Sequence, residues 1–155
     1  MLVYRIQCAS NKGPYRNYRY CIDHDEYSPE SDKLRPGPES DGIDCITAKC
    51  YFGFLSLEQL LRWFTAKDRR NFRRAGLKVA VYKVPPKYVY VGGKQVAFVQ
   101  RKGKIERILD PLTLEEMKFE GTWESLAPKP KNEKAKKGKR MAKDKVERLV
   151  PVIKF

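Results

Sequence analysis

The chain has 155 residues, of which 41% are apolar, a length and composition typical of one domain with a modest core. Lys and Arg total 33 against 19 Asp and Glu, and the resulting charge of +14 indicates a polyanionic or acidic partner and excludes a negatively charged mimic of DNA. No apolar run approaches the roughly 20 residues of a membrane span, and the opening apolar stretch is too short for a secretory signal, so we expect a cytoplasmic protein without a membrane partner.

The first third of the chain predicts one strand followed by a long acidic loop. Residues 2–7 alternate apolar and polar side chains, as a half-buried strand does. Residues 23–44 carry eight acidic and two basic side chains with three prolines, so we expect a long irregular loop. This loop could bind a divalent cation, lie in solvent beside the protein's own arginines, or shield a basic face. It contains no calcium-loop motif, and we predict no metal site.

The principal helix is predicted after a short aromatic strand at residues 49–55. Ser56 is a good N-cap, and Gln59 stands three residues later, as in a capping box. Apolar residues then recur at helical spacing, which predicts one helix running to about Arg74 with Gly76 at its C′ position. Its last turns are rich in cations.

After this helix, apolar residues recur at every second position, which predicts consecutive antiparallel strands. Residues 77–84 form the first strand, and residues 88–91 and 95–100 form a hairpin around Gly92 and Gly93. Paired glycines are typical of tight turns that need positive φ values. Residues 105–109 are a further short strand.

The expected fold class is α+β, with a mostly antiparallel sheet packed on one principal helix and a basic, Lys-rich C-terminal excursion. We expect a compact domain over residues 1–126, which includes the acidic loop. Residues 127–145 are predicted to be a basic flexible segment, and residues 146–155 an apolar C-terminal strand or tail. Residues 127–155 hold 11 basic and 3 acidic side chains, so the charge is concentrated there.

Cations near the end of the predicted helix form the first candidate site, a surface for nucleic acid or an acidic partner. Positions 69 and 73, and 70 and 74, are each one turn apart, so the arginines form two rows. The alternative is that they only complement the negative end of the helix dipole. The predicted contacts are Arg69, Arg70, Arg73, Arg74 and Lys78, with an electrostatic arm that includes Lys131, Lys136, Lys137, Lys139 and Arg140.

A second candidate interleaves aromatic rings and arginines, as single-stranded nucleic acid requires for base stacking and phosphate contact. Its members are Tyr15, Arg16, Tyr18 and Arg19. The alternative is a strand whose tyrosines pack on one face with their hydroxyls in water.

Catalytic motifs of hydrolases and P-loop enzymes are absent from the sequence, and four cysteines without a Cys-x2-Cys pair do not predict a zinc site. One layout does resemble the ADP-ribosyltransferase family: Tyr4-Arg5 on the first strand, Phe54-Leu55-Ser56 leading into a helix, and Gln95-Val96-Ala97-Phe98 on a late strand. The resemblance implies NAD as cofactor, with Arg5 at the diphosphate and Ser56 at the nicotinamide ribose. Lys94 and Gln95 stand where that family has a glutamate.

The chain also resembles small accessory proteins of tailed bacteriophages, because it is small and basic and begins its helix with Phe-Gly-Phe-Leu-Ser-Leu-Glu-Gln-Leu at residues 52–60. This resemblance implies action in the host cytoplasm on nucleic acid or on a defence complex. We therefore expect a phage-encoded, non-enzymatic binding protein without a cofactor, which engages nucleic acid or an acidic face of a host nucleoprotein complex and inhibits it. The alternatives are an NAD-dependent ADP-ribosyltransferase-like enzyme that modifies a host target, and an inhibitor directed only at protein.

Overall fold

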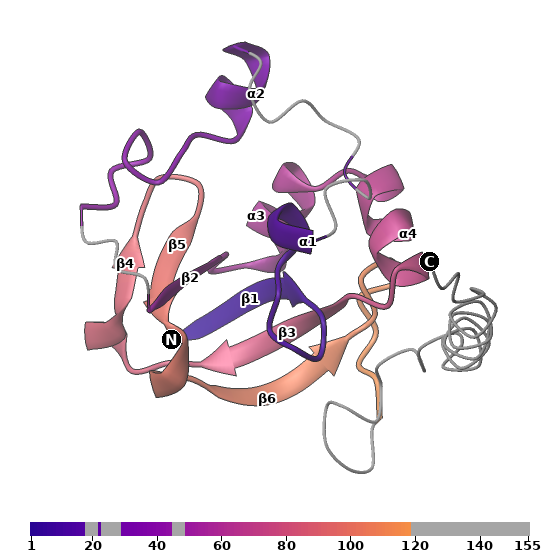
Figure 1. Ribbon diagram of the computed structural model, residues 1–155. Coiled ribbons are helices and arrows are strands. Elements are labelled where there is room, and N and C mark those ends of the chain that lie inside the picture. Colours follow the sequence, from indigo (N-terminus) through magenta and orange to yellow (C-terminus); the bar gives the residue numbers. More distant parts are fainter. Residues whose placement is uncertain (18–21, 23–28, 45–48, 119–155) are drawn as a thin grey trace, which may run out of the picture.

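The computed structural model describes residues 1–17, 22, 29–44 and 49–118 (Figure 1). Helices and antiparallel strands are mixed along the chain, which confirms the α+β class. The elements, in order, are β1 (Leu2–Gln7), α1 (Pro14–Asn17), α2 (Pro29–Leu34), β2 (Cys50–Gly53), α3 (Leu57–Trp63), α4 (Ala66–Arg74), β3 (Lys78–Lys83), the 3-10 helix η2 (Pro86–Tyr88), β4 (Val89–Val91), β5 (Val96–Val99), the 3-10 helix η3 (Gln100–Lys102) and β6 (Lys104–Leu109).

The strands form two antiparallel sheets that meet at β1. One sheet has the order β1-β3-β6 and the other β2-β5-β4. Tyr4 and Phe54 join them, because the backbone N–H of each donates to the carbonyl of the other at 2.8 and 2.9 Å. A Cβ atom on Gly53 would lie 2.8 Å from the Tyr4 carbonyl oxygen, so this crossing requires a glycine.

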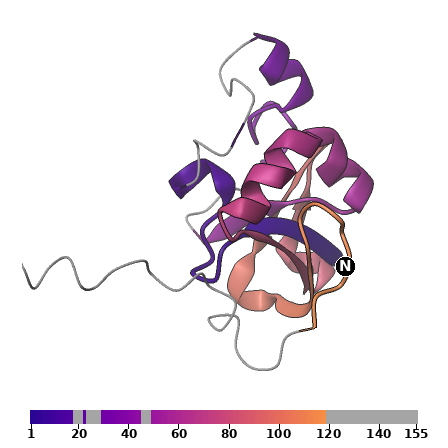
Figure 2. The ribbon, with the colours of Figure 1, turned by 90° about the vertical axis from the view of Figure 1, so that its right-hand side faces the viewer.

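Strand β3 is buried on both faces and separates two parts of the core. Its Val79 and Val81 face a cluster that includes Leu60 of α3 and Phe72 of α4. Its alternate residues, Ala80 and Tyr82, face the second sheet. Successive side chains of β3 thus point to opposite faces of the sheet. Helices α3 and α4 both pack on one of these faces, on the same side of the β1-β3-β6 sheet (Figure 2).

Two helices replace the single principal helix that the apolar periodicity predicts. Helix α3 ends at Phe64, whose φ of −112° and ψ of 123° are extended. Thr65 then begins α4 with a full capping box to Asp68. The break lets the Phe64 ring pack edge-on against Phe72, with centroids 5.0 Å apart, and a continuous helix lacks this contact.

Other local expectations are partly corrected. Ser56 caps α3 as predicted, although the Gln59 side chain accepts from the Leu55 N–H instead of the cap residue. Gly76 has a φ of 82° and terminates α4 as predicted. The acidic stretch is not wholly irregular, because it contains α2. The hairpin of β4 and β5 is confirmed, but neither of its turn glycines has a left-handed φ.

Among the described residues, no helix has the length and apolar character to cross a bilayer. The domain limits predicted at residues 126 and 145 lie outside the described residues, as does the segment predicted to be a basic arm.

Candidate functional site

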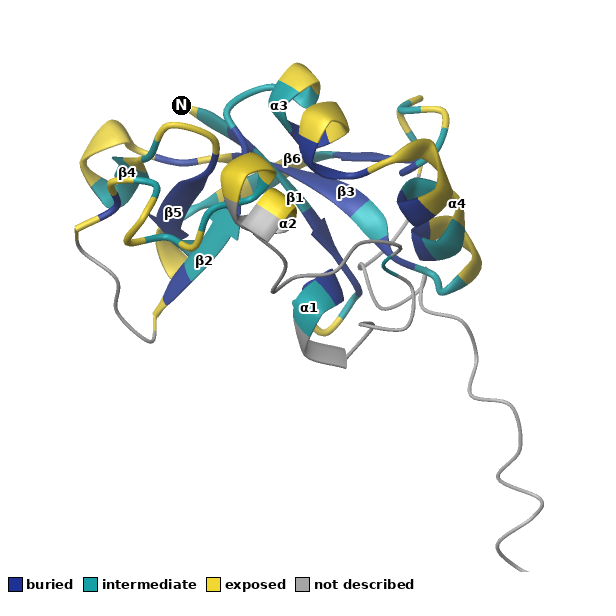
Figure 3. Ribbon diagram, turned by 90° about the horizontal axis from the view of Figure 1, so that it is seen from above, coloured by how far each residue is buried: buried dark blue, intermediate teal, exposed yellow. Residues whose placement is uncertain are grey.

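Helix α4 carries five cations and one acidic residue in nine positions. The single acid, Asp68, is fully buried. Its carboxylate accepts hydrogen bonds from the Thr65 N–H at 2.8 Å and from the Thr65 hydroxyl at 2.9 Å. The capping box therefore removes the negative charge from the surface of the helix. Exposed positions of α4 lie on its outer side, away from the sheet (Figure 3).

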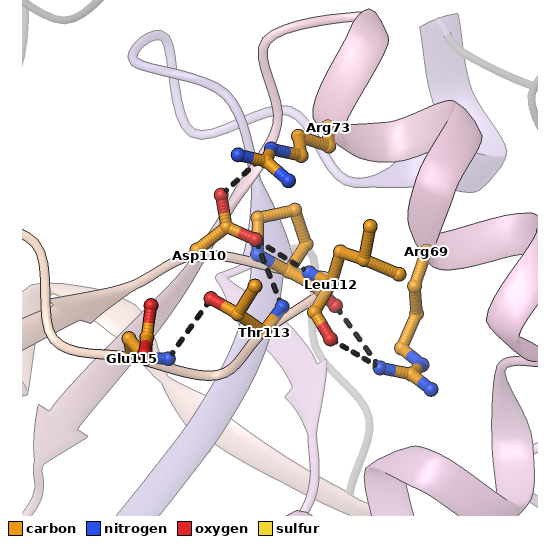
Figure 4. Close-up of polar contacts among 7 residues, drawn as sticks. Arg69, Arg73, Asp110, Leu112, Thr113 and Glu115 are labelled. Atoms are coloured by element: carbon orange, nitrogen blue, oxygen red, sulfur yellow. Dashed lines mark hydrogen bonds and ion pairs between the residues drawn. The ribbon is translucent and has the colours of Figure 1, made fainter.

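One row of the predicted arginine cluster is engaged by the loop that follows β6 (Figure 4). The Nη1 atom of Arg69 donates to the carbonyls of Pro111 at 3.4 Å and Leu112 at 3.0 Å. The Nε atom of Arg73 lies 3.1 Å from Oδ2 of Asp110. These two arginines therefore fix α4 to the end of β6.

Asp110 is the acid on which this contact depends. Burial acts to raise the pKa of its carboxyl group, but other effects outweigh burial and the pKa is lowered. The lowering effects are hydrogen bonds from the backbone N–H groups of Thr113 and Leu112, together with the charges of Arg73 and Lys78. Lys78, a predicted contact for a partner, thus contributes to the same internal charge balance.

The second row of the cluster faces outward. Arg70 and Arg74 are one helical turn apart and both are exposed. In the part of the chain that the structure describes, neither side chain takes part in a hydrogen bond or an ion pair. Lys67, also exposed, precedes Arg70 by three positions and therefore lies on the same face of α4. We call Lys67, Arg70 and Arg74 the outer row.

The aromatic candidate is only partly described. The Tyr15 hydroxyl accepts from Nε1 of Trp63 at 2.7 Å, and its ring centroid is 6.0 Å from that of Phe64. Tyr15 lies in a short helix, not a strand, and packs against the core. The Arg16 side chain, the predicted contacts Tyr18 and Arg19, and the C-terminal set Lys131, Lys136, Lys137, Lys139 and Arg140 lie outside the described residues.

Two of the three residues of the transferase alternative meet at a cavity of about 680 Å³, which Arg5 and Gln95 both line. The guanidinium of Arg5 donates to the Phe52 carbonyl at 2.7 Å and lies 4.5 Å from the Tyr51 ring centroid. The Gln95 amide donates to the Pro36 carbonyl. Ser56 does not line this cavity, and its hydroxyl accepts from the Gln59 N–H as a helix cap. NAD binding stays a prediction of the resemblance alone.

Among the described residues, no three His, Cys, Asp or Glu side chains gather around a common point. Sequence reasoning did miss a second group of cations, at the far end of β3. Arg101, Lys102 and Lys104 lie there beside Lys83. The only signal was a basic turn, Arg-Lys-Gly-Lys, which had no evident neighbour in the sequence.

Comparisons with known proteins point to bacteriophages. A family model described as "Bacteriophage T4 Y00F protein" matches residues 1–111. A protein of Enterobacteria phage T4, described as an uncharacterized 19.7 kDa protein in the motB-dexA intergenic region, is 40% identical over 53 residues. That match covers 34% of this chain and 32% of the T4 protein, so it spans about a third of that relative. No solved structure matches.

Proposed function

This chain belongs to the bacteriophage T4 Y00F protein family, and from that premise we propose that it is a non-enzymatic phage protein that binds nucleic acid through the outer row of α4. The family match supports a phage origin for the protein. The proposed nucleic-acid binding rests on the site alone, because one fold hosts many functions.

The observation that carries the proposal is the division of the α4 cations. Asp68 is buried in the capping box, and Arg69 and Arg73 are occupied by residues 110–112. Arg70 and Arg74 remain exposed, with no partner among the described residues. If these cations served only the helix dipole, they would not need to be exposed and unpaired on one face. The dipole acts on any charge near the last turn of the helix.

Binding would proceed by electrostatic contact with phosphate groups. Each guanidinium that neutralises a phosphate releases condensed counterions, so affinity falls as salt rises. Contacts of this kind position a protein on the backbone and carry no base specificity by themselves. We therefore propose binding that tolerates many sequences, and inhibition of a host nucleoprotein complex by competition for its nucleic acid.

The test is a salt titration with labelled DNA and RNA oligonucleotides on the full chain. Replacing Arg70 and Arg74 with alanine should reduce the slope of log affinity against log salt by about 2, or roughly 0.9 per lost contact on duplex DNA. Arg70→Glu with Arg74→Glu should abolish binding to duplex DNA at 150 mM salt.

A matched control is Lys33→Glu with Arg62→Glu, which makes the same change in net charge at exposed sites on α2 and α3. If both double variants weaken binding equally, only net charge matters and the outer row is not the site. Binding to an acidic host protein that survives nuclease treatment, with no affinity for oligonucleotides, would assign the outer row to a protein partner instead.

A further inference from the structure

A second cationic surface lies at the end of β3 that is remote from α4. A groove of about 430 Å³ runs there between the end of β3 and η3. Its apolar lining includes Met1, Val84, Pro85 and Pro86. Val84 is fully buried, and the two prolines are exposed and conformationally stiff. Among the described residues that line it, four have cationic side chains and none has an acidic one: Lys83, Arg101, Lys102 and Lys104. We call this the η3 groove.

Two of these cations face each other directly across the sheet. Lys83 of β3 and Lys104 of β6 are register partners in the antiparallel ladder. Like charges in this position destabilise a sheet. Within the described part of the chain, the carboxylate that pairs with one of these cations belongs to Glu106, whose Oε1 lies 3.4 Å from Nζ of Lys83. One carboxylate does not balance four cations, so the free protein retains a repulsion that a bound anion would relieve.

One lysine of the groove shares an aromatic ring with a lysine beside the groove. Nζ of Lys87, from η2, lies 5.1 Å from the Tyr88 ring centroid, and Nζ of Lys102, from η3, lies 5.3 Å from it. The ring packs against the second part of the core. Cation–π attraction therefore holds two flexible lysines near one fixed point, which reduces the entropy lost when they bind a ligand.

Close packing of η3 on β3 depends on Gly103. A Cβ atom at this position would lie 3.0 Å from Cδ1 of Tyr82 and 3.1 Å from Cγ2 of Val84. The absence of a side chain lets the cations of η3 approach the end of β3. The backbone at Gly103 thus fixes how close η3 lies to β3.

We propose that the η3 groove binds single-stranded nucleic acid, with its cations on the phosphates and its exposed prolines, Pro85 and Pro86, against the bases. Cations beside exposed proline rings suit a ligand that alternates charged and flat apolar groups. An acidic peptide offers the charge without the rings. This inference rests on the proposed function for its ligand class, but it uses a surface that shares no residue with the outer row.

The test compares a labelled 12-nucleotide single strand with a duplex of the same length, using the full chain with Lys102→Glu and Lys104→Glu. Single-strand affinity should fall at least about tenfold at 50 mM salt, and the salt slope should become shallower by about 1.4, or roughly 0.7 per contact. Duplex affinity should fall less than single-strand affinity. The control is again Lys33→Glu with Arg62→Glu.

A stability measurement excludes misfolding as the cause. Lys104→Glu places opposite charges across from each other at Lys83, so its melting temperature should not fall while single-strand affinity does. Tyr88→Phe should retain affinity because it keeps the ring, whereas Tyr88→Leu should lose part of it.

Unchanged single-strand affinity in the Lys102→Glu/Lys104→Glu variant would overturn the inference, as would an equal loss of binding to polyglutamate. The two proposals fail separately. If Arg70→Glu/Arg74→Glu binds normally while the η3 variant does not, the outer row is wrong and the η3 groove stands.

Discussion

Asp41 occupies the space that a side chain at Gly92 would need. A Cβ atom on Gly92 would lie 2.9 Å from the Asp41 carbonyl oxygen and 2.9 Å from Cγ1 of Ile43. The Asp41 carboxylate accepts hydrogen bonds from the backbone N–H groups of Lys94 and Gln95, at 2.9 Å for each to Oδ2. Asp41 of the acidic stretch therefore holds the β4–β5 turn through these hydrogen bonds. Position 92 requires a glycine, because a side chain there would collide with Asp41 and Ile43.

Replacing Asp41 with alanine should lower the free energy of unfolding by about 1–3 kcal/mol, because two backbone N–H groups lose a charged acceptor. Urea denaturation measures this change. The control is Asp44→Ala, an exposed acid nearby, which should change stability by less than about 0.5 kcal/mol. Equal effects of the two substitutions would show that charge, not hydrogen bonding, is responsible.

Gly92→Ala should destabilise the protein by about 1–3 kcal/mol, since the new methyl group displaces backbone of the Asp41 loop. Gly37→Ala is the matched control, because nothing lies within 4 Å of a Cβ atom there. That control should be neutral or slightly stabilising, as the unfolded chain loses freedom. Thermal unfolding of both variants decides the point, and a neutral Gly92→Ala would contradict the steric explanation.

The lowered pKa of Asp110 predicts a specific loss of stability in acid. A carboxyl group with a lower pKa in the folded state stabilises the fold above its unfolded pKa of about 3.9. That contribution is lost as the pH falls below this value and through the folded pKa. Asp110→Asn should therefore be less stable than the parent at pH 7, with a difference that shrinks toward pH 2.

Urea titrations at several pH values test this expectation, with Glu115→Gln as control in the same loop. The free energy of unfolding of Asp110→Asn could instead differ from that of the parent by the same amount from pH 7 to pH 2. That result would show that the contact with Arg73 is independent of charge.

Thr65→Ala should destabilise the protein by about 1 kcal/mol, because α4 loses the hydroxyl that caps it and that contacts Asp68. Thr65→Ser keeps the hydroxyl and should retain most of the stability. Chemical denaturation of the pair distinguishes capping from simple loss of a methyl group, since equal losses would assign the effect to the methyl.

Local patterns predicted the elements that depend on neighbours in sequence. The alternation in β1 and β3, the Ser56 cap and the Gly76 terminus are each readable within a few residues. The break between α3 and α4 was missed because the apolar stripe continues across it. Its signal was present in Thr65 and Asp68, which have capping-box spacing.

The candidate site was less predictable, because its character depends on contacts far along the chain. Four similar arginines of α4 differ only in what they meet, and Arg69 meets Pro111 and Leu112, more than 40 residues later. The η3 groove likewise depends on the pairing of Lys83 with Lys104 across two strands. No local sequence pattern predicts this pairing. Side-chain type predicted a basic surface, and tertiary structure selects which cations are available.

The unbalanced cations of the outer row and of the Lys83–Lys104 pair give the protein two opposite responses to ionic strength. Added salt shortens the Debye length from about 10 Å at 0.1 M to about 3 Å at 1 M. Screening weakens contact with phosphates, but it also relieves repulsion within the outer row and between Lys83 and Lys104. The free protein should therefore melt at a higher temperature in the concentrated salt that releases its ligand, and a purification that ends in low salt would hold it at its least stable.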